Sequence, residues 1–443
     1  MAPYNIHRIQ QDHISRLYFD YRMKKILLAF AFIASIGFVM AQSESTENKW
    51  SYKFHGFVNP VLYGDTRQVV AGREGMMLFY PSPVKMDASG QNDLNDLPSL
   101  NMLAITARVN LSVSGPDVLG AHLRGFIEGD FTGPTNETIN TLRLRHAYIN
   151  MDWEKHSLLM GQYWYPMVIH EIMPMTQPLN MGAPFHPYAR YNQFRYTYRL
   201  GKWEAVAVAA FQLDNKSQGP LGASTQYIKT GMVPEFNAQV RYKGEKIFAG
   251  AAANFMSIKP RNVDIYGNKA DTRYNSSSFS LFGKYSIGQV TIKAQTILSD
   301  NLYEGCTMGG YIECMDTFSV AGSCSYSYKP FTWTTAWVDF SRNTGKWRPA
   351  LFLGYGVNNN FGDSYDVTDT PYGRGFDMQS LWRVQPRVSF FAGHGLSFMF
   401  DVEVTNAQYG KKVTDSPTSY HFEADAKNDP TNVRLILGAQ YDF

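Results

Sequence analysis

Apolar and polar residues alternate along many short stretches of this chain. From Ile105 to Val113, apolar residues occupy every second position, and Thr, Arg, Asn and Ser stand between them. The same pattern runs from Phe236 to Lys243 and from Arg434 to Phe443, where only Ile436 interrupts the polar row. Successive side chains of a strand point to opposite faces, so the pattern predicts strands with one apolar and one polar face.

Seventeen such strands are expected from Trp50 onward, separated by turns rich in Gly, Pro, Asn and Asp, with no amphipathic helix. Their centres are Phe54, Val109, Gly125, Tyr148, Leu159, Arg195, Val208, Gln239, Ala252, Leu281, Lys293, Val320, Trp337, Leu353, Val384, Phe400 and Leu437. Short and long connections alternate, except between Phe331 and Ser380. If Phe331 to Gly356 contributes one crossing strand, the total becomes sixteen. The sequence therefore predicts an all-β fold, a transmembrane antiparallel β-barrel of sixteen strands with short periplasmic turns.

The last strand ends on two aromatic residues. Leu435, Leu437, Tyr441 and Phe443 share its apolar face, and the chain stops at Phe443. This ending resembles the carboxy-terminal strand of Gram-negative outer-membrane barrels, which forms their assembly signal. The resemblance implies recognition by the barrel-assembly machinery. The alternative is a half-buried strand of a soluble sheet.

The amino-terminal region predicts export. Lys24 and Lys25 precede a short apolar stretch, and Val39 to Ala41 forms a small-residue cleavage site. These features are typical of a secretory signal peptide, and the apolar run is too short for a spanning helix. We expect four regions: an upstream start extension (1–22), a signal peptide (23–41), a short periplasmic segment (42–49) and the barrel (50–443).

Charge and composition further narrow the class of protein. The formal net charge of +3 is carried by residues 1–41, which contain five basic and two acidic residues, so the exported chain is close to neutral. A nucleic-acid surface needs a clearly basic domain, so no nucleic-acid partner is expected. Aromatic residues at 15% and 36 glycines fit a twisted barrel with aromatic girdles in outer-membrane lipid.

The polar face of the strands carries charges that we place inside the barrel, because charges facing lipid are costly. The phase of Arg143 and Arg145 is ambiguous, since Tyr148 and Ile149 disagree on which face continues, but we expect both inside. The expected pore-lining residues are Arg108, Arg124, Glu128, Asp130, Arg143, Arg145, Arg195, Arg199, Arg241, Arg383, Arg387, Asp401, Glu403 and Arg434. A mostly basic lumen predicts a modest preference for anions. Alternatively, these arginines are paired wall residues without selectivity.

The segment from Trp164 to Tyr191 is unlike a solvated loop. It is rich in proline, methionine and aromatic residues. Its position after the fifth strand resembles the third external loop of porins, which folds inside the barrel. We expect it to present His170, Glu171 and His186 to the arginines as a constriction. Alternatively, it covers the barrel mouth or a subunit interface.

The chain has three cysteines. Cys306 and Cys314 bracket a glycine-rich segment, and in an oxidising compartment a disulfide between them is plausible. Cys324 would then remain in a strand. Neither the cysteines nor the loop histidines show a metal-ligand spacing, so no metal and no cofactor are expected.

Together these features resemble porins, and the segments Gly161–Met167 and Pro184–Tyr198 with the arginine-rich faces are similar to the DcaP-like group. The resemblance implies a sixteen-stranded barrel, homotrimers, and passive uptake of small hydrophilic solutes, often anionic. The chain departs from some members because residues 42 to 50 leave no room for a periplasmic coiled coil.

Other functions fit the sequence less well than a porin. An outer-membrane enzyme would need a converging nucleophile and base, but G-x-S-x-G and HExxH motifs are absent from the sequence, so no enzyme is expected. A plugged transporter needs a globular region before the barrel, whereas strands begin near Trp50. A channel for hydrophobic ligands remains an alternative because of the methionine-rich loop, as does a surface receptor or adhesin barrel.

Overall fold

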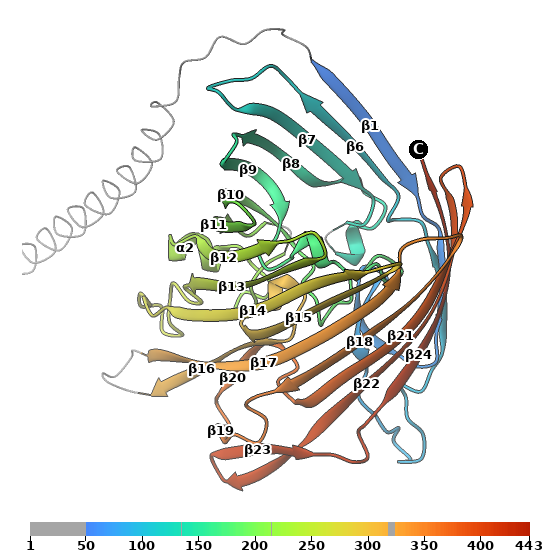
Figure 1. Ribbon diagram of the computed structural model, residues 1–443. Coiled ribbons are helices and arrows are strands. Elements are labelled where there is room, and N and C mark those ends of the chain that lie inside the picture. The colour runs from blue at the N-terminus through green and yellow to red at the C-terminus, as the bar shows by residue number, and fades with distance from the viewer. Residues whose placement is uncertain (1–49, 134, 214, 318–323) are drawn as a thin grey trace, which may run out of the picture.

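The computed structural model describes residues 50–133, 135–213, 215–317 and 324–443. The expected start extension, signal peptide and periplasmic segment, and the strand centre at Val320, lie outside these residues. Sixteen antiparallel strand crossings form a closed barrel (Figure 1). The predicted all-β fold is confirmed.

The first two crossings are each built from two strands. β1 (Ser51–Val58) and β2 (Val61–Asp65) are separated at Asn59 and Pro60, and β5 (Ser99–Leu103) and β6 (Arg108–Ser114) form the second crossing. The other crossings are β7 (His122–Asp130), β8 (Arg143–Asp152), β9 (His156–Trp164), β10 (Arg190–Leu200), β11 (Trp203–Phe211), β12 (Glu235–Lys243), β13 (Ile247–Ile258), β14 (Tyr274–Ile287), β15 (Val290–Asp300), β17 (Cys324–Arg342), β18 (Trp347–Asn358), β21 (Met378–Gly393), β22 (Leu396–Ser416) and β24 (Thr431–Asp442).

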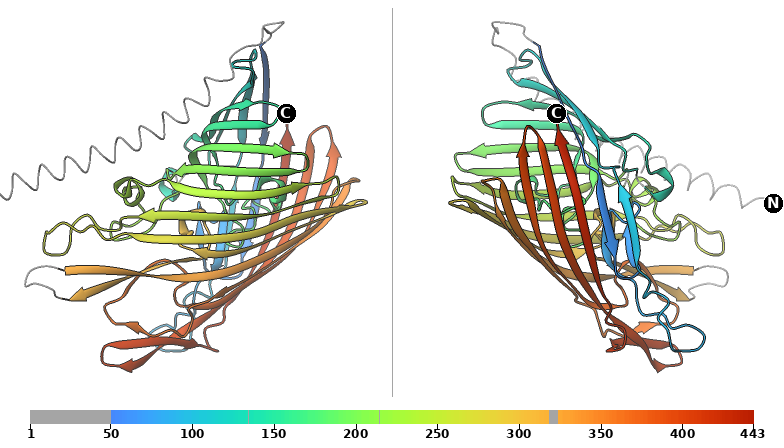
Figure 2. Two further views of the ribbon diagram at one scale, coloured as in Figure 1. Left: turned by 60° about the vertical axis from the view of Figure 1, so that its left-hand side comes forward. Right: turned by 90° about the vertical axis from the view of Figure 1, so that its right-hand side faces the viewer.

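The last crossing closes the barrel on the first. β24 pairs with β22 on one side, and with β1 and β2 on the other, in a register that places Val58 opposite Tyr441. Figure 2 shows β24, in red, lying beside the blue first strands. Closure leaves no free edge in the wall, as a sheet in lipid requires.

The expected reduction of Phe331–Gly356 to one crossing is wrong. Both β17 and β18 cross the wall, and they join through the short turn after Arg342. The extra strand belongs to an extension instead: β16 (Gly309–Thr317) pairs with residues 324–331 of β17 and with β20 (Thr370–Arg374). Because this hairpin lies beyond the wall, it has a strand's sequence pattern without adding a crossing.

The connections between crossings are alternately short and long, as predicted. Turns such as Gly201-Lys202 and Gly288-Gln289 lie at one end, and at the other end the loops are long and carry small elements. These elements are β3 (Val69–Gly72), β4 (Met77–Pro81), η1 (Asn136–Thr138), η2 (His170–Ile172), α2 (Gln226–Gly231), η3 (Tyr303–Gly305), β19 (Tyr365–Asp366) and β23 (Ser419–Ala424). In the described part of the chain, none of the helices has the length and apolarity to cross a membrane.

The two faces of the wall differ in chemistry. On β12, Phe236 and Val240 are 47% and 55% exposed on the outer face, whereas Asn237, Gln239 and Arg241 are buried on the inner face. The same outward exposure holds for Leu435, Leu437, Tyr441 and Phe443. Exposed apolar side chains on the outer face of the strands suit a lipid environment.

Candidate functional site

The barrel interior holds the segment from Trp164 to Tyr191. Wall side chains bind its carbonyl oxygens from several directions: Gln239 donates to Pro166 at 2.7 Å, Lys293 to Met173 at 2.8 Å, and Arg383 to Ala183 at 2.7 Å. These donors come from β12, β15 and β21, so the loop spans the interior. The predicted inward fold of the third external loop is confirmed.

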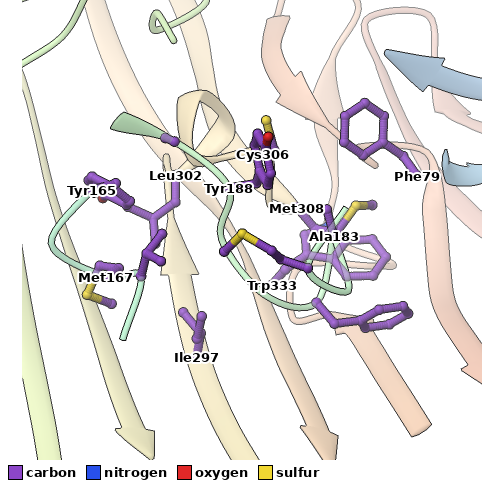
Figure 3. Close-up of a cluster of buried hydrophobic side chains, with 14 of the residues drawn as sticks. Phe79, Tyr165, Met167, Ala183, Tyr188, Ile297, Leu302, Cys306, Met308 and Trp333 are labelled. Atoms are coloured by element: carbon purple, nitrogen blue, oxygen red, sulfur yellow. The ribbon is translucent and has the colours of Figure 1, made fainter. Parts of the chain in front are cut away.

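Apolar side chains anchor this loop to the wall. Figure 3 shows Met167 and Ala183 of the loop together with Ile297 and Trp333 of the wall. Phe185 packs on Phe352 and also lies directly over Gly354, where an added Cβ would approach its ring to 2.7 Å. The loop's unusual proline, methionine and aromatic content is therefore explained by burial inside the barrel.

A second external segment also enters the barrel, which the sequence did not predict. The hairpin of β3 and β4 buries Met76 and Met77 completely or nearly so, and two wall arginines bind its backbone. Arg434 donates to Gly75 at 2.6 Å, and Arg383 donates to Leu78 at 2.9 Å. The only signal in the sequence is the apolar run of residues 76–80 within an otherwise polar loop.

A β-bulge explains the ambiguous phase around Arg145. Glu128 pairs with His146 and Gly129 with Leu144, so Arg145 is the extra residue of β8. A bulge leaves one residue unpaired and changes the alternation, and here Arg145 and the next residue are both buried. Arg143 and Arg145 therefore both face inward, and they reach Asp130 at 3.1 and 2.5 Å.

Three further expected pore arginines, on β21 and β24, are buried in ion pairs. Arg383 reaches Glu403 at 3.2 Å, Arg387 reaches Asp339 at 2.6 Å, and Arg434 reaches Asp65 at 2.7 Å. Asp401, also expected in the pore, accepts hydrogen bonds from the Gln177 backbone and the Gln385 side chain. For this part of the wall, the pattern agrees with the alternative of paired structural residues.

The other expected arginines follow β6, β7, β10 and β12. Arg108 lies 3.7 Å from Glu128, Arg199 lies 2.8 Å from Asp152, and Arg241 lies 3.5 Å from Glu171. Arg195 and Arg124 make no ion pair within the described residues. The Arg195 guanidinium bonds Gln193 and faces the ring of Tyr163 at 5.5 Å. Arg124 lies near the short-turn end of β7, on the same row as Glu128.

The three loop residues expected at a constriction do not lie together. His170 is exposed, and Glu171 lies between Arg241 and Lys243, 3.4 Å from the lysine nitrogen. The placement of His186 beside the arginines is wrong. It is fully buried edge-on against Trp337, because the proline-rich turn around it packs into the apolar cluster.

Lys243 is a site residue that the sequence analysis missed, although it continues the polar row of Gln239 and Arg241. Its nitrogen lies 3.0 Å from Glu204, so it joins the same charged group. The alternation of polar residues along β12 is the signal that could have identified Lys243.

The expected disulfide between Cys306 and Cys314 is not formed. Cys314 is a free thiol within β16, whereas the Cys306 sulfur faces the Asn215 amide at 3.5 Å. A disulfide needs Cα atoms about 4.4–6.8 Å apart. Because Gly309 to Cys314 is extended at about 3.3 Å per residue, the two cysteines are carried apart rather than brought together.

Comparison with known proteins supports the fold. No protein-family model matches the chain, and no curated protein matches it. Among solved structures, the outer membrane channel DcaP of Acinetobacter baumannii superposes with a TM-score of 0.62 at 16% identity, over 91% of this chain and 100% of that one. The anion-selective porin from Comamonas acidovorans gives 0.54 at 9% identity, over 89% and 100%. Salmonella typhi OmpF gives 0.50 at 11%, over 88% and 97%.

The chain therefore has the fold of the outer-membrane porins. Within that class, its barrel is similar to that of the DcaP channel along nearly its whole length.

Proposed function

We propose that this protein is an outer-membrane porin, a passive diffusion channel for small hydrophilic solutes. The observation that carries the proposal is the division of strands such as β12 into an apolar exposed face and a charged or amide-bearing inner face. On β12 the inner row is Glu235, Asn237, Gln239 and Arg241. A water-filled passage through lipid needs this division, because water and polar solutes contact the inner face while lipid contacts the outer one.

We further propose a modest preference for anions. Arg195 and Arg124 lie on inner rows of β10 and β7 without a carboxylate in ion-pair distance among the described residues. Glu171, on the inserted loop, is held by Arg241 and Lys243, which reduces its repulsion of anions. The solved Comamonas structure with this fold is described as anion-selective. The Arg124 and Arg195 charges, which no described carboxylate neutralises at ion-pair distance, favour negative solutes.

A channel for hydrophobic ligands is the less favoured alternative. Its binding site would need apolar side chains that face an open path. The methionine and aromatic side chains of the inserted loop are instead buried against the wall, as Met167 and Phe185 show. They hold the loop in place. A receptor role for the β16–β17 extension is compatible with a channel through the barrel.

The remaining partners are proposals as well. Residues 23–41 would direct export, and the outward row of Leu435, Leu437, Tyr441 and Phe443 would be read by the barrel-assembly machinery in the outer membrane. Homotrimeric assembly is proposed from the resemblance to DcaP-like porins.

Liposome swelling tests the channel proposal. Vesicles that contain the folded protein are transferred into isosmotic solutions of neutral sugars of increasing size. We expect swelling rates that fall steeply with sugar size and need no energy source. Folding is checked independently by the shift in gel mobility on heating. Folded protein that admits none of the sugars would contradict a diffusion channel.

A further inference from the structure

Five arginines gather around Tyr188 where the first and third external loops meet the wall. Arg73 lies in the turn between β3 and β4, and Arg190 begins β10; their guanidinium carbons lie 5.2 and 5.1 Å from the Tyr188 ring centre. Arg108, Arg143 and Arg145 interact electrostatically with the same phenol. The arginine cluster consists of Arg73, Arg108, Arg143, Arg145 and Arg190.

The carboxylates of this region do not balance the cluster. Glu128 and Asp130 bind Arg145 at 2.7 and 2.5 Å, and Asp130 also binds Arg143 at 3.1 Å. No described carboxylate lies within ion-pair distance of Arg73 or Arg190. Burial and the Arg143 charge lower the pKa of Arg73, and attraction by groups such as Asp130 offsets only part of that shift.

Unsatisfied donors mark the same place. Arg73 Nη1 and Arg190 Nη2 are buried without a hydrogen-bond partner, and the two side chains are only 5% and 3% exposed. One face of Arg190 is covered by the Trp164 ring at 3.9 Å. On its edge, Nε bonds His146 at 3.4 Å, whereas Nη2 has no partner. Buried polar groups are almost always paired, so two such donors on cations that both lie beside Tyr188 indicate an acceptor that carries negative charge.

We propose that the arginine cluster binds one inorganic oxyanion, phosphate or sulfate. A tetrahedral dianion offers several acceptor oxygens to guanidinium groups and supplies the two negative charges that Arg73 and Arg190 lack. It would join the inserted turn (Arg73), the third loop (Tyr188) and the wall (Arg190). The burial of these side chains favours a compact ion over an extended solute. This site is separate from Arg124 of the proposed channel and does not depend on conduction.

Equilibrium dialysis of the full chain, folded in detergent, tests the proposal with radiolabelled inorganic phosphate at constant ionic strength. We expect saturable binding of about one phosphate per chain, displaced by sulfate. The double variant Arg73→Gln/Arg190→Gln should weaken binding by about tenfold or more, since each charged hydrogen bond contributes substantially. The control Arg342→Gln/Arg348→Gln removes the same charge at the short turn between β17 and β18, and should bind like the wild type.

The site is contradicted if folded wild-type protein, identified by its gel mobility, binds no phosphate saturably. It is also contradicted if both double variants bind phosphate equally well, or if chloride at the same ionic strength displaces phosphate as effectively as sulfate does. Equal competition by succinate would overturn it too, and would assign the cluster to passing solutes instead. If the Gln double variant fails to fold, Arg73→Lys replaces it, because lysine keeps the charge but loses the planar pair of donors. Weaker phosphate binding by folded Arg73→Lys supports the site, and unchanged binding contradicts it.

Discussion

Gly56 and Phe443 exchange two backbone hydrogen bonds, each 2.9 Å long, and so join the last residue of the chain to the first crossing of the barrel. The Phe443 ring lies 6.3 Å from that of Phe54 and 6.4 Å from that of Tyr441. The aromatic ending recognised in the sequence is thus also part of the seam.

Enlarging Gly56 should weaken this seam. An added Cβ would lie 2.7 Å from the Arg108 carbonyl oxygen and 2.8 Å from the Phe443 ring. We expect Gly56→Ala to lower the free energy of unfolding by about 1–3 kcal/mol, the usual cost of overpacking. Urea unfolding followed by tryptophan fluorescence measures it. Gly125→Ala is the control, because a Cβ there meets nothing within 4 Å; equal effects of both changes would contradict the seam.

Removing Asp65 should be more damaging. Its carboxylate binds Arg434 through two contacts of 2.8 and 2.7 Å, and both side chains are almost fully buried. Asp65→Ala leaves a buried, uncompensated guanidinium, which should cost about 3–5 kcal/mol in the same unfolding assay. Lys269→Ala, which breaks the exposed pair with Asp271, should change stability by about 0–1 kcal/mol. A small loss of unfolding free energy in Asp65→Ala would contradict this expectation and show that water solvates the Arg434 guanidinium.

Gly354 should control the position of the inserted loop. Any side chain there displaces the Phe185 ring, since a Cβ at residue 354 would lie 2.7 Å from that ring. We expect Gly354→Val to detach this part of the loop and to raise the single-channel conductance. Gly283→Ala, with only ordinary contacts at 3.5 Å and beyond, should leave the conductance unchanged. A lower or unchanged conductance in Gly354→Val would mean that Phe185 does not hold the loop against the wall.

Arg124 and Arg195, which have no carboxylate in ion-pair distance among the described residues, should set the ion selectivity. Arg124→Gln/Arg195→Gln should shift the reversal potential in a salt gradient toward cation preference, because both positive charges face the interior. Lys411→Gln removes charge from an exposed external hairpin, where Lys411 pairs with Glu423, and should have little effect. If the arginine variant keeps the wild-type potential, selectivity lies elsewhere in the barrel.

The external hairpin of β22 and β23 should respond to pH. A hydrogen bond to Asp415, with Glu423 nearby, raises the pKa of His421 above its ordinary 6.5. The resulting stabilisation of the hairpin is fully present below the unfolded pKa and disappears as the pH rises through the folded one. NMR titration should give a midpoint above 6.5, and Asp415→Asn should lower it. A midpoint at or below 6.5 in the wild type would contradict the pairing.

The barrel is predictable from the sequence because a wall with lipid outside and water inside imposes a period of two on each crossing. That signal reports a strand and its faces, but not whether the strand crosses the membrane. The crossing count around β17 is therefore wrong, since the hairpin of β16 and β17 continues the strand pattern beyond the wall. The bulge at Arg145 shifts the alternation by one residue, which leaves its phase undecided in the sequence.

The interior is less predictable because it depends on contacts between distant residues. The sequence around Arg434 does not predict that its partner is Asp65, which lies 369 residues away. His186 has the polar side chain expected at a constriction, whereas its neighbours Phe185 and Pro187 carry it into the apolar cluster. Polar residue types indicate the inner face, but their pairing decides which charges remain for a solute.

Single-channel recording in planar bilayers, with the reversal potential measured across a salt gradient, tests the porin proposal most directly. Folded protein should produce steady conductance steps without an energy source, and the potential should have the sign of a modest anion preference. Complete absence of steps from protein whose folding is shown by heat-modifiable mobility would contradict an open channel.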